Sequence, residues 1–300
     1  MNKDNRILVL GGSGMLAQAI TKISKNNGYQ VENLSKSTGF DLLKDVKRMK
    51  LHKVINQIKP VFVINTIGIT DLQYCERNPK EAWILHAHLP FLLSKWSKEN
   101  NIPWVQISTD HFFSGNKNQY HKEKAKTIPV NTYAASKLAG EKLALTSSSA
   151  LVLRTNIIGK RGWEGKPNFA EWVLNNLKEN KIINAYTDTW ASSIEVNQFA
   201  FLALKLIEND SRGLMNLACS ESISKADLIE KIAKYARQST QNIRRVQTPK
   251  ASINQVKRAN SMGLDCKLAQ IKLEKLGLHL PDSDNVAKET VKSLMQKDFL

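Results

Sequence analysis

A tyrosine and a lysine with a spacing suited to proton transfer occur in the segment Tyr133-Ala-Ala-Ser-Lys137. On a helix this spacing puts the phenol of Tyr133 and the ammonium of Lys137 on one face, one turn apart. A neighbouring ammonium can lower the pKa of a phenol, so that Tyr133 would exchange a proton near neutral pH. Tyr120 and Lys124 have the same spacing, but they lie in a polar stretch that predicts a solvated loop. Tyr133 is therefore the candidate catalytic acid.

Thr109 is a further candidate because it directly follows the apolar run at residues 104–107. Ligands of open α/β sheets bind at the carboxyl ends of the strands, where the hydroxyl of Thr109 would orient a substrate carbonyl. Threonine at the end of a strand is also a common turn former. Thr109 alone leaves both roles open, whereas Thr109, Tyr133 and Lys137 together predict a catalytic trio.

A glycine-rich turn, Gly11-Gly-Ser-Gly14-Met-Leu-Ala17, follows the apolar run at residues 7–10. Gly11 permits a tight turn, and Gly14 lets the backbone approach a pyrophosphate at the start of the next helix. Ala17 is small enough for that helix to pack closely on the strand. An ordinary strand–helix turn is the alternative interpretation. The position of the turn at the head of an alternating chain favours a dinucleotide site.

Strand-like and helix-like segments alternate along the first half of the chain. Apolar runs of strand length occupy residues 7–10, 30–34, 61–65, 104–107 and 150–153, and helical patterns occupy residues 81–96 and 133–145. After about residue 155 the alternation loosens, with further helical patterns over residues 169–179 and 196–207. This alternation predicts an α/β fold with a Rossmann-type, doubly wound parallel sheet. We expect a coenzyme-binding domain over residues 1–156. Residues 157–300 should form a smaller α/β substrate-binding lobe, of which some segments can return to the first sheet.

Two local patterns refine the second half. Ser224-Lys-Ala-Asp227 has the spacing of a capping box at the start of a helix. Residues 243–275 are basic and show little hydrophobic periodicity.

Several features argue against a secreted, membrane or metal-binding protein. No segment approaches the roughly 20 apolar residues of a membrane span, and the N-terminus has no signal-peptide pattern. The three cysteines, Cys75, Cys219 and Cys266, are far apart and lack metal-site spacing. They indicate buried thiols of a reducing compartment. The six histidines show no ligand spacing either. We expect a cytoplasmic protein with no metal and no membrane insertion.

The chain is strongly basic, with 44 Lys and Arg against 27 Asp and Glu and a formal net charge of +17. A lysine-rich surface explains this balance, and attraction of an anionic coenzyme and a phosphorylated substrate is the alternative. The basic residues form no long block, so we predict no nucleic-acid partner. A homodimer stays open.

The motifs together resemble an extended short-chain dehydrogenase/reductase, and more narrowly the dTDP-4-dehydrorhamnose reductase family of sugar-nucleotide 4-ketoreductases. The resemblance spans nearly the whole chain. Its first elements are Asn65-Thr-Ile-Gly-Ile-Thr70, Cys75-Glu76-x-x-Pro79, Ser108-Thr109-Asp110, Tyr133-x-x-x-Lys137-x-x-Gly140-Glu141 and Arg154-Thr155. The C-terminal elements are Arg258-Ala-Asn-Ser, Leu264-Asp265-Cys266-x-Leu268, Leu276-Gly277 and Leu280-Pro281.

The resemblance implies reduction of a nucleotide-diphosphate 4-keto-6-deoxyhexose to a deoxysugar nucleotide, in surface-polysaccharide precursor synthesis. Tyr133 would protonate the keto oxygen, Lys137 would hold the ribose, and Thr109 would orient the carbonyl. Expected coenzyme contacts are Gly11, Gly14, Met15, Leu16, Ser35, Lys36, Asp41, Leu42, Thr66, Ile67, Gly68, Tyr133 and Lys137. Expected substrate contacts are Thr70, Asp110, His111, Asn156 and Arg258.

Several positions depart from the family pattern. His111-Phe-Phe stands where Tyr-Val-Phe is usual, and Gln73-Tyr74 replaces an Asp and a basic residue. His86 replaces a common Asn, and the segment after Arg154 lacks the family's tryptophan and tyrosine. These differences predict the same chemistry on a different sugar.

The coenzyme expected is NADP(H) in preference to NAD(H). NAD-binding sites place an acidic residue at the end of the second strand, where it accepts hydrogen bonds from the ribose. Here that position reads Leu34-Ser35-Lys36, without a carboxylate. Ser35 and Lys36 would tolerate a 2′-phosphate, and Glu32 is the main objection.

Two other functions stay open. An epimerase or dehydratase of the same superfamily is one, although a dehydratase normally needs an Asp-Glu pair that Thr109-Asp110 does not provide. A non-catalytic NADP-binding subunit is the other, because the regulatory subunit of methionine adenosyltransferase resembles the same family. The complete trio favours an enzyme.

The substrate diphosphate requires cations from the second lobe. Candidates are Lys160, Arg161, Lys166, Arg244, Arg245, Lys257 and Arg258. We prefer Arg258, because it opens a C-terminal element of the family and its planar fork suits phosphate oxygens. The alternative is that Arg258 only ties the C-terminal segment to the body.

Overall fold

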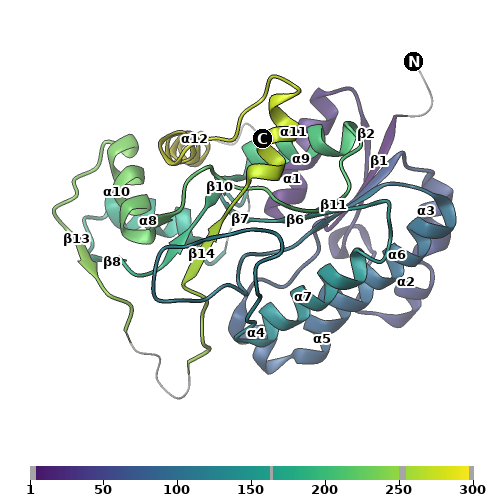
Figure 1. Cartoon of the computed structure of the whole chain (residues 1–300), viewed down its shortest axis with the longest axis horizontal. Coiled ribbons are helices and arrows are strands. Elements are labelled where there is room, and N and C mark those ends of the chain that lie inside the picture. The colour runs from purple at the N-terminus through teal and green to yellow at the C-terminus, as the bar shows by residue number, and fades with distance from the viewer. Residues whose placement is uncertain (1–4, 163–164, 250–254, 297–300) are drawn as a thin grey trace.

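A six-stranded parallel sheet forms the centre of the molecule in a computed structural model, which describes residues 5–162, 165–249 and 255–296 (Figure 1). Its strand order is β11-β6-β4-β3-β1-β2. The strands are β1 (Arg6–Leu10), β2 (Gln30–Leu34), β3 (Phe62–Asn65), β4 (Trp104–Ile107), β6 (Ala150–Arg154) and β11 (Gly213–Asn216). The five strands predicted from the first half are confirmed. The strand order reverses between β1 and β3, which makes their carboxyl ends the expected ligand crevice.

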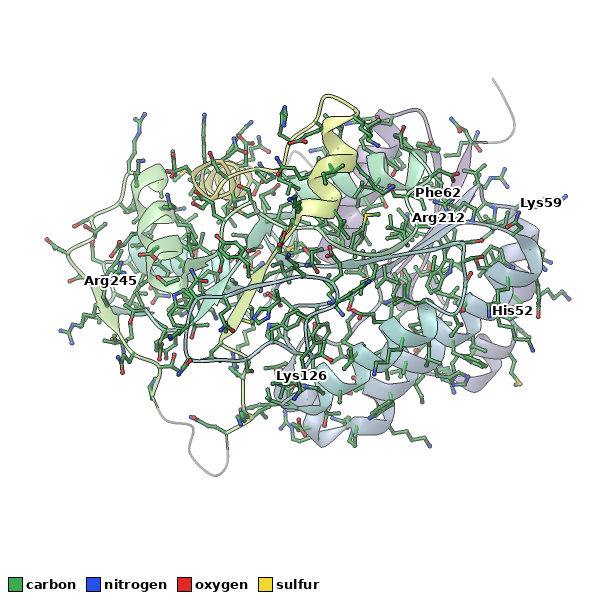
Figure 2. The ribbon with its side chains drawn as sticks, viewed as in Figure 1. His52, Lys59, Phe62, Lys126, Arg212 and Arg245 are labelled. Carbon is green, nitrogen blue, oxygen red and sulfur yellow. The ribbon has the colours of Figure 1, made fainter. Side chains whose placement is uncertain are left out.

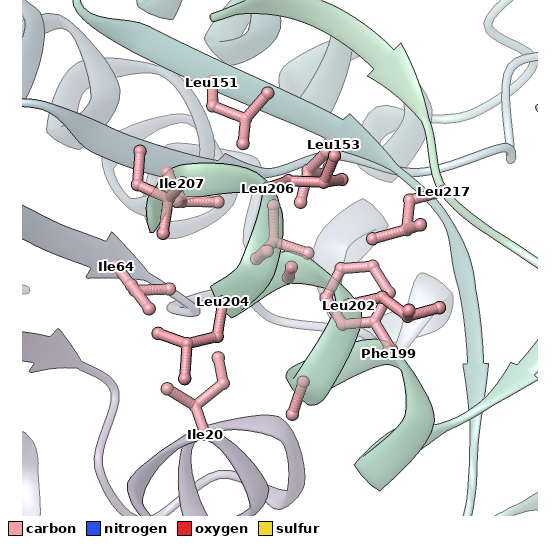
Figure 3. Packing of buried hydrophobic residues seen from close by; sticks show 14 of the residues in the cluster. Ile20, Ile64, Leu151, Leu153, Phe199, Leu202, Leu204, Leu206, Ile207 and Leu217 are labelled. Atoms are coloured by element: carbon pink, nitrogen blue, oxygen red, sulfur yellow. The ribbon is translucent and has the colours of Figure 1, made fainter. Parts of the chain in front are cut away.

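Helices cover both faces of this sheet. Figure 1 shows α1 (Met15–Asn26), α9 (Val196–Glu208) and α11 (Lys267–Glu274) on one face. The opposite face carries α2 (Asp45–Met49), α3 (Leu51–Ile58), α6 (Leu89–Asn100) and α7 (Thr132–Ala144). Alternate residues of β1 enter the two cores: Ile7 and Val9 pack toward α9, whereas Leu8 and Leu10 pack toward α3 and α6. Figure 3 shows how Phe199, Leu202 and Leu206 of α9 fill the first core. The predicted doubly wound α/β sheet is confirmed.

The segment predicted as one helix over residues 81–96 is broken into several elements. The chain forms α4 (Leu72–Arg77), α5 (Pro79–Trp83), a π-helical turn η2 (Ile84–His88) and then α6. Gly140 of α7 packs directly against η2, because a Cβ at Gly140 would lie 1.7 Å from the carbonyl oxygen of His86. Hydrophobic periodicity did not reveal this tertiary contact, and such π turns are frequent at functional sites.

A second core forms around three helices of the C-terminal half, α8 (Phe169–Lys178), α10 (Lys225–Ala236) and α12 (Ser283–Met295). The predicted capping box is confirmed, since Ser224 and Asp227 cap α10 reciprocally. Short strands complete this part: β5 (Tyr120–His121), β7 (Asn156–Ile158), β8 (Ile183–Tyr186), β9 (Trp190–Ala191), β10 (Ser193–Glu195), β12 (Ile223–Ser224), β13 (Ile243–Val246) and β14 (Ser261–Leu264). α9 and β11 belong to the first sheet, although they lie within residues 157–300. The division at residue 156 stays a prediction.

The expectation of a loop at Tyr120 was wrong, and the weakly periodic residues 243–275 contain regular elements. Tyr120 is 53% exposed, as a solvated position should be, but it forms β5 with His121 and pairs with β14 instead of lying in a loop. Residues 243–275 contain β13, β14 and α11, despite their weak periodicity. Strands of this length are fixed by their neighbours: β13 pairs with β8, and β14 with β5 and β9. Pairing of this kind leaves little signal in a single sequence.

The cysteines are free and buried, as expected for structural thiols. Burial is the main cause that raises the pKa of Cys75 to about 11 and that of Cys219 to about 12. In the described part of the chain, no helix is long and apolar enough to cross a membrane. The same residues contain no group of three or more His, Cys, Asp or Glu side chains that could hold a metal ion.

Candidate active site

Thr109, Tyr133 and Lys137 meet at the carboxyl end of β4. Thr109 follows β4, and the other two lie on the first turns of α7. All three side chains are buried. Thr109 makes a side-chain hydrogen bond with Tyr133, and the ammonium of Lys137 donates to the carbonyl oxygen of Ile107 at 2.6 Å. The structure therefore brings together the trio that the sequence predicted.

The electrostatics of the trio differ from the sequence-based expectation. Burial raises the pKa of Tyr133 to about 12, and the hydrogen bond with Thr109 only partly opposes this rise. Burial also lowers the pKa of Lys137 to about 8. In the protein alone, desolvation outweighs any lowering of the Tyr133 pKa by the lysine. The phenol is thus held protonated near neutral pH, as a proton donor must be.

The N-terminus of α7 is anchored by two polar side chains. Asn131 accepts a hydrogen bond from the backbone N–H of Ala134 at 2.8 Å. Glu76 accepts from the backbone N–H of Thr132 at 2.6 Å and from its hydroxyl at 2.7 Å. Glu76 belongs to the Cys75-Glu76 element, whose role in capping the catalytic helix the sequence did not reveal. It fixes the turn that carries Tyr133.

A buried ion pair holds α7 against the sheet. The guanidinium of Arg154 donates to both carboxylate oxygens of Glu141, at 2.6 and 2.9 Å, and Ser108 donates to the same carboxylate at 2.8 Å. Arg154 also lies over the rings of Phe112 and Phe113, at 5.0 and 5.5 Å from their centres. Both charged groups are fully partnered, so the pair fixes the distance between β4, β6 and the catalytic helix.

His86 packs against the ring of Tyr133. Its Nε2 accepts the backbone N–H of Ile69 at 2.8 Å, so the neutral ring carries its proton on Nδ1, which lies 2.8 Å from the hydroxyl of Ser136. Burial and the charge of Lys137 lower the pKa of His86 to about 3. Its ring meets that of Tyr133 edge-on, with centres 5.5 Å apart. A neutral histidine thus replaces the family's asparagine as a positioning residue.

The glycine turn has the geometry of a phosphate cradle. Gly11 has a φ of +97°, and a Cβ there would lie 2.7 Å from the hydroxyl of Thr66. Gly14 precedes α1, which has no side-chain cap and no acidic residue in its first turn. The N–H groups at the start of α1 therefore remain available to an anion. Bare backbone, a tight turn and an uncapped helix fit the pyrophosphate of a nicotinamide dinucleotide.

The other predicted coenzyme residues surround this turn. Thr66 donates to the carbonyl oxygen of Leu10 at 2.7 Å, and a Cβ on Gly68 would lie 3.9 Å from the ammonium of Lys137. Leu42 is buried in the core beside α3, and Asp41 accepts from the backbone N–H of Leu43. Met15, Leu16 and Ile67 are partly buried and pack against the two cores that flank the sheet.

The end of β2 shows which side chains face the turn. Ser35 is buried and caps the short 3-10 helix η1 (Lys36–Thr38), while Lys36 is exposed. A Cβ on Gly12 would lie 2.7 Å from Asn33, so Asn33 is the β2 side chain that abuts the glycine turn. The sequence analysis did not single out Asn33. Glu32 is exposed and precedes Asn33, so it points to the opposite face of the strand.

A buried polar chain adjoins the trio. Asp110 is fully buried and accepts a hydrogen bond from the amide of Asn156 at 2.7 Å. Asn156 in turn accepts from the hydroxyl of Ser193 at 3.0 Å. Burial raises the pKa of Asp110 to about 7. Asp110 and Asn156 therefore lie beside the trio, as predicted for substrate contacts.

Two cations of the C-terminal lobe lie near His111, which contacts the catalytic tyrosine. The ring of His111 meets that of Tyr133 edge-on at 5.5 Å, and its buried Nδ1 has no hydrogen-bond partner among the described residues. Burial, Lys225 and Arg258 together lower the pKa of His111 to about 4. Lys225 and Arg258 therefore lie close to the reacting end of the site. Lys225 was not singled out by the sequence analysis. Thr70 is exposed on the loop after β3.

Most of the other predicted cations lie elsewhere or are engaged. Arg245 lies on β13 at the outer end of the C-terminal lobe (Figure 2) and pairs with Asp227 and Glu230, each at 2.9 Å. Arg161 pairs with Glu171 at 3.5 Å, and Lys160 donates to the carbonyl oxygen of Gln296. The loop that carries Arg161 approaches α1, because a Cβ on Gly162 would lie 2.7 Å from the side chain of Gln18. Of these candidates, Arg258 is the one found beside the trio.

Comparison with known proteins agrees with this geometry. The family model described as "RmlD substrate binding domain" matches residues 5–295. A probable low-salt glycan biosynthesis reductase of Haloferax volcanii is 26% identical over 235 residues, which cover 75% of this chain and 78% of that protein. A dTDP-4-dehydrorhamnose reductase of Aggregatibacter actinomycetemcomitans is 26% identical over 206 residues, which cover 68% and 67% of the two chains.

A solved structure has the same fold. The dTDP-4-dehydrorhamnose reductase of Bacillus anthracis, crystallised in complex with NADP, superposes with a TM-score of 0.83. It is 22% identical, and the match covers 97% of this chain and 98% of that one. The likeness therefore extends over the sheet and the C-terminal lobe together.

Proposed function

This chain belongs to the RmlD substrate binding domain family, and on that premise we propose that it reduces the keto group of a nucleotide-diphosphate 4-keto-6-deoxyhexose. The product is a deoxysugar nucleotide for surface-polysaccharide synthesis. Relatives named as dTDP-4-dehydrorhamnose reductases support this substrate class. The observation that carries the proposal is the buried trio Thr109, Tyr133 and Lys137 beside an uncapped glycine turn.

Each member of the trio has a distinct role. When bound, a nicotinamide coenzyme supplies the hydride for the keto carbon. Tyr133 donates its phenolic proton to the keto oxygen, which it can do because its raised pKa keeps it protonated. Thr109 orients the carbonyl through its hydroxyl. Lys137 binds the ribose hydroxyls and stabilises the phenolate that remains after proton transfer.

The surrounding residues hold the two molecules. Gly11, Gly14 and Thr66 shape the pyrophosphate cradle, and Gly68 leaves space over Lys137. On the substrate side, the proposed contacts are Thr70, Asp110, His111, Asn156 and Arg258. The buried hydrogen bonds of Asp110 and Asn156 limit their movement, so they fix the sugar pocket and do not adapt to each ligand.

We favour NADPH over NADH as the coenzyme. The β2 side chain beside the glycine turn is the neutral amide of Asn33, and the carboxylate of Glu32 belongs to the opposite strand face. Lys36 is exposed just beyond β2, where it can attract a 2′-phosphate. The buried hydroxyl of Ser35 lies 2.8 Å from that of Ser37, which leaves Lys36 as the main contributor.

The test is coenzyme oxidation by the purified protein. Absorbance at the reduced-nicotinamide band is followed with dTDP- and UDP-linked 4-keto-6-deoxyhexoses, and the product is identified by mass spectrometry. A product two hydrogens heavier than the substrate, formed with equal loss of NADPH, supports the reductase. A change of stereochemistry without net loss of coenzyme would indicate an epimerase. Binding of NADPH without turnover of any sugar would indicate a regulatory subunit.

A further inference from the structure

Two cationic residues adjoin the same end of a strand in a small sheet of the C-terminal lobe. In the sheet of order β12-β9-β14-β5, Ser224 of β12 and Ser261 of β14 both pair with Trp190 of β9. β12 is antiparallel to β9, whereas β14 is parallel to it. Lys225 after β12 and Arg258 before β14 therefore extend beyond the same end of β9. The register alone brings together residues 33 positions apart in the sequence.

Hydrogen bonds hold the segments that carry Lys225 and Arg258 near the catalytic helix α7. Lys225 donates its backbone N–H to Thr189 at 2.9 Å, and Trp190 donates its own to Asn260 at 2.8 Å. The amide of Asn131, the cap of α7, donates to the carbonyl oxygen of Lys257 at 2.9 Å. The segment that carries Arg258 is thus attached to the turn that carries Tyr133.

The charge at this place is not balanced by protein carboxylates. Among the described residues, neither Lys225 nor Arg258 forms an ion pair, and the ammonium of Lys225 lies over the ring of Phe169 at 5.3 Å. Burial lowers the pKa of Lys225, and the like charge of Arg258 nearby adds to this effect. The acid that opposes them is Asp110, whose own pKa is raised to about 7. Arg258 is exposed and Lys225 is partly buried, so these two adjoining cations, with one weak acid beside them, favour binding of an anion from solution.

We propose that Lys225 is a substrate-binding residue that holds, together with Arg258, the diphosphate of the nucleotide sugar. This inference rests on the proposed function and adds the residue that holds the phosphate next to the sugar. In such a substrate the diphosphate is attached across the sugar ring from the keto carbon. His111 contacts Tyr133 on one side and is near the two cations of the C-terminal lobe on the other, so the sugar ring would lie between Tyr133 and the cations. Neutral His111, with a free Nδ1, supplies a hydrogen bond between the two ends.

Calorimetric titration with dTDP and with UDP tests this assignment without any turnover. Lys225→Met should weaken binding of the preferred nucleotide by roughly 10- to 100-fold, as expected for loss of a charge-assisted hydrogen bond. Lys225→Arg should restore most of the affinity. Lys234→Met, an exposed position on the same helix, is the matched control and should bind as the wild type does. Lys225→Gln serves as a second removal variant.

A thermal measurement separates binding from a structural role. Because Lys225 and Arg258 repel each other in the free protein, Lys225→Met should melt at the wild-type temperature or above it. The rise in melting temperature on adding nucleotide should be largely lost. A lowered melting temperature with unchanged nucleotide affinity would overturn the proposal and make Lys225 a structural contact of Phe169.

The remaining outcomes are also decisive. Unchanged nucleotide binding with a raised KM for the sugar nucleotide would place the anion on the sugar ring, as a carboxylate, and overturn the diphosphate assignment. The same would follow if the wild-type chain bound neither nucleotide. Failure of the wild-type chain to reduce any 4-keto sugar would instead overturn the proposed reaction, while the nucleotide titrations would still report on Lys225.

Discussion

The two sides of the active site are built in opposite ways. On the side of α7, polar groups are matched to one another: the buried Arg154 with Glu141, the buried His86 with Ser136 and Ile69, and the exposed Glu76 with Thr132. On the side of the C-terminal lobe, Lys225 and Arg258 form no ion pair within the part of the chain that the structure describes. One side is satisfied by the protein itself, and the other is the side on which we propose that the substrate diphosphate binds.

This difference separates chemistry from recognition. Proton transfer needs donor and acceptor held within a few tenths of an ångström, and closed hydrogen-bond networks provide that rigidity. Recognition of an anion needs charge that the protein has not already neutralised. Substitutions on the α7 side should therefore change kcat or stability, whereas those on the lobe side should change KM.

The largest effect is expected from Tyr133→Phe. The ring still packs, but the proton donor is lost, so kcat should fall by about 10²- to 10⁴-fold while NADPH affinity stays nearly the same. Steady-state kinetics and coenzyme titration measure the two quantities. Retention of more than about a tenth of the wild-type kcat would contradict the assignment of Tyr133 as the acid.

Tyr120→Phe is the internal control for that experiment. The side chain of Tyr120 is exposed, and its hydroxyl oxygen accepts the backbone N–H of Ser222 at 3.0 Å. Loss of this acceptor should lower the free energy of unfolding by about 1–3 kcal/mol and leave kcat unchanged.

Arg154→Ala should be the most damaging change to stability. It leaves the buried carboxylate of Glu141 without its partner, so the free energy of unfolding should fall by about 3–5 kcal/mol in urea denaturation. Arg245→Ala removes a 44% exposed arginine with two carboxylate partners and should cost less than about 1 kcal/mol. Equal losses in the two variants would show that the buried Arg154–Glu141 pair contributes no more to stability than an exposed pair does.

The pH dependence of stability provides a test of His86. Its pKa is about 3 in the folded protein and about 6.5 in the unfolded chain, which therefore binds the additional proton between these values. Stability should fall as the pH drops from about 6.5 toward 3, and the contribution of His86 amounts to about 1.4 kcal/mol per pH unit. His86→Asn should flatten this acid limb. Identical slopes for wild type and variant would show that His86 does not titrate in this way.

Arg258→Ala tests the lobe side. We expect the KM for the sugar nucleotide to rise by about tenfold, with no change in NADPH affinity, because a charge-assisted contact to phosphate is lost. Added salt should raise the wild-type KM in the same direction. A lower melting temperature with an unchanged KM would instead favour the view that Arg258 only ties the C-terminal segment to the body.

The smallest effect concerns the coenzyme. NADPH should bind a few-fold more tightly than NADH, since an exposed ion pair contributes only about 0.2–1 kcal/mol. Lys36→Ala should reduce the preference for NADPH. Lys25→Ala should not change it, because Lys25 is in the last turn of α1, at the opposite end of this helix from the glycine turn. Equal or tighter binding of NADH by the wild type would mean that Glu32 or another carboxylate reaches the ribose.

The sequence by itself determined the coenzyme half of the molecule. Buried parallel strands leave continuous apolar runs, and the runs at β1, β3, β4 and β6 were found because both their faces are covered. The glycine turn and the Tyr133-Lys137 spacing are local in sequence, so a single chain reveals them. The capping box of α10 was predictable for the same reason.

Only the tertiary structure decided how the site is supported and charged. Glu76 caps a helix that begins 56 residues later, and Arg154 pairs across two elements with Glu141. Lys225 and Arg258 come together near His111 only because β12 and β14 share β9 in a particular register. Each of these contacts depends on strand pairing or helix packing between distant segments, and neither periodicity nor local spacing encodes them. The pKa of Tyr133 likewise follows from burial, which the spacing to Lys137 could not predict.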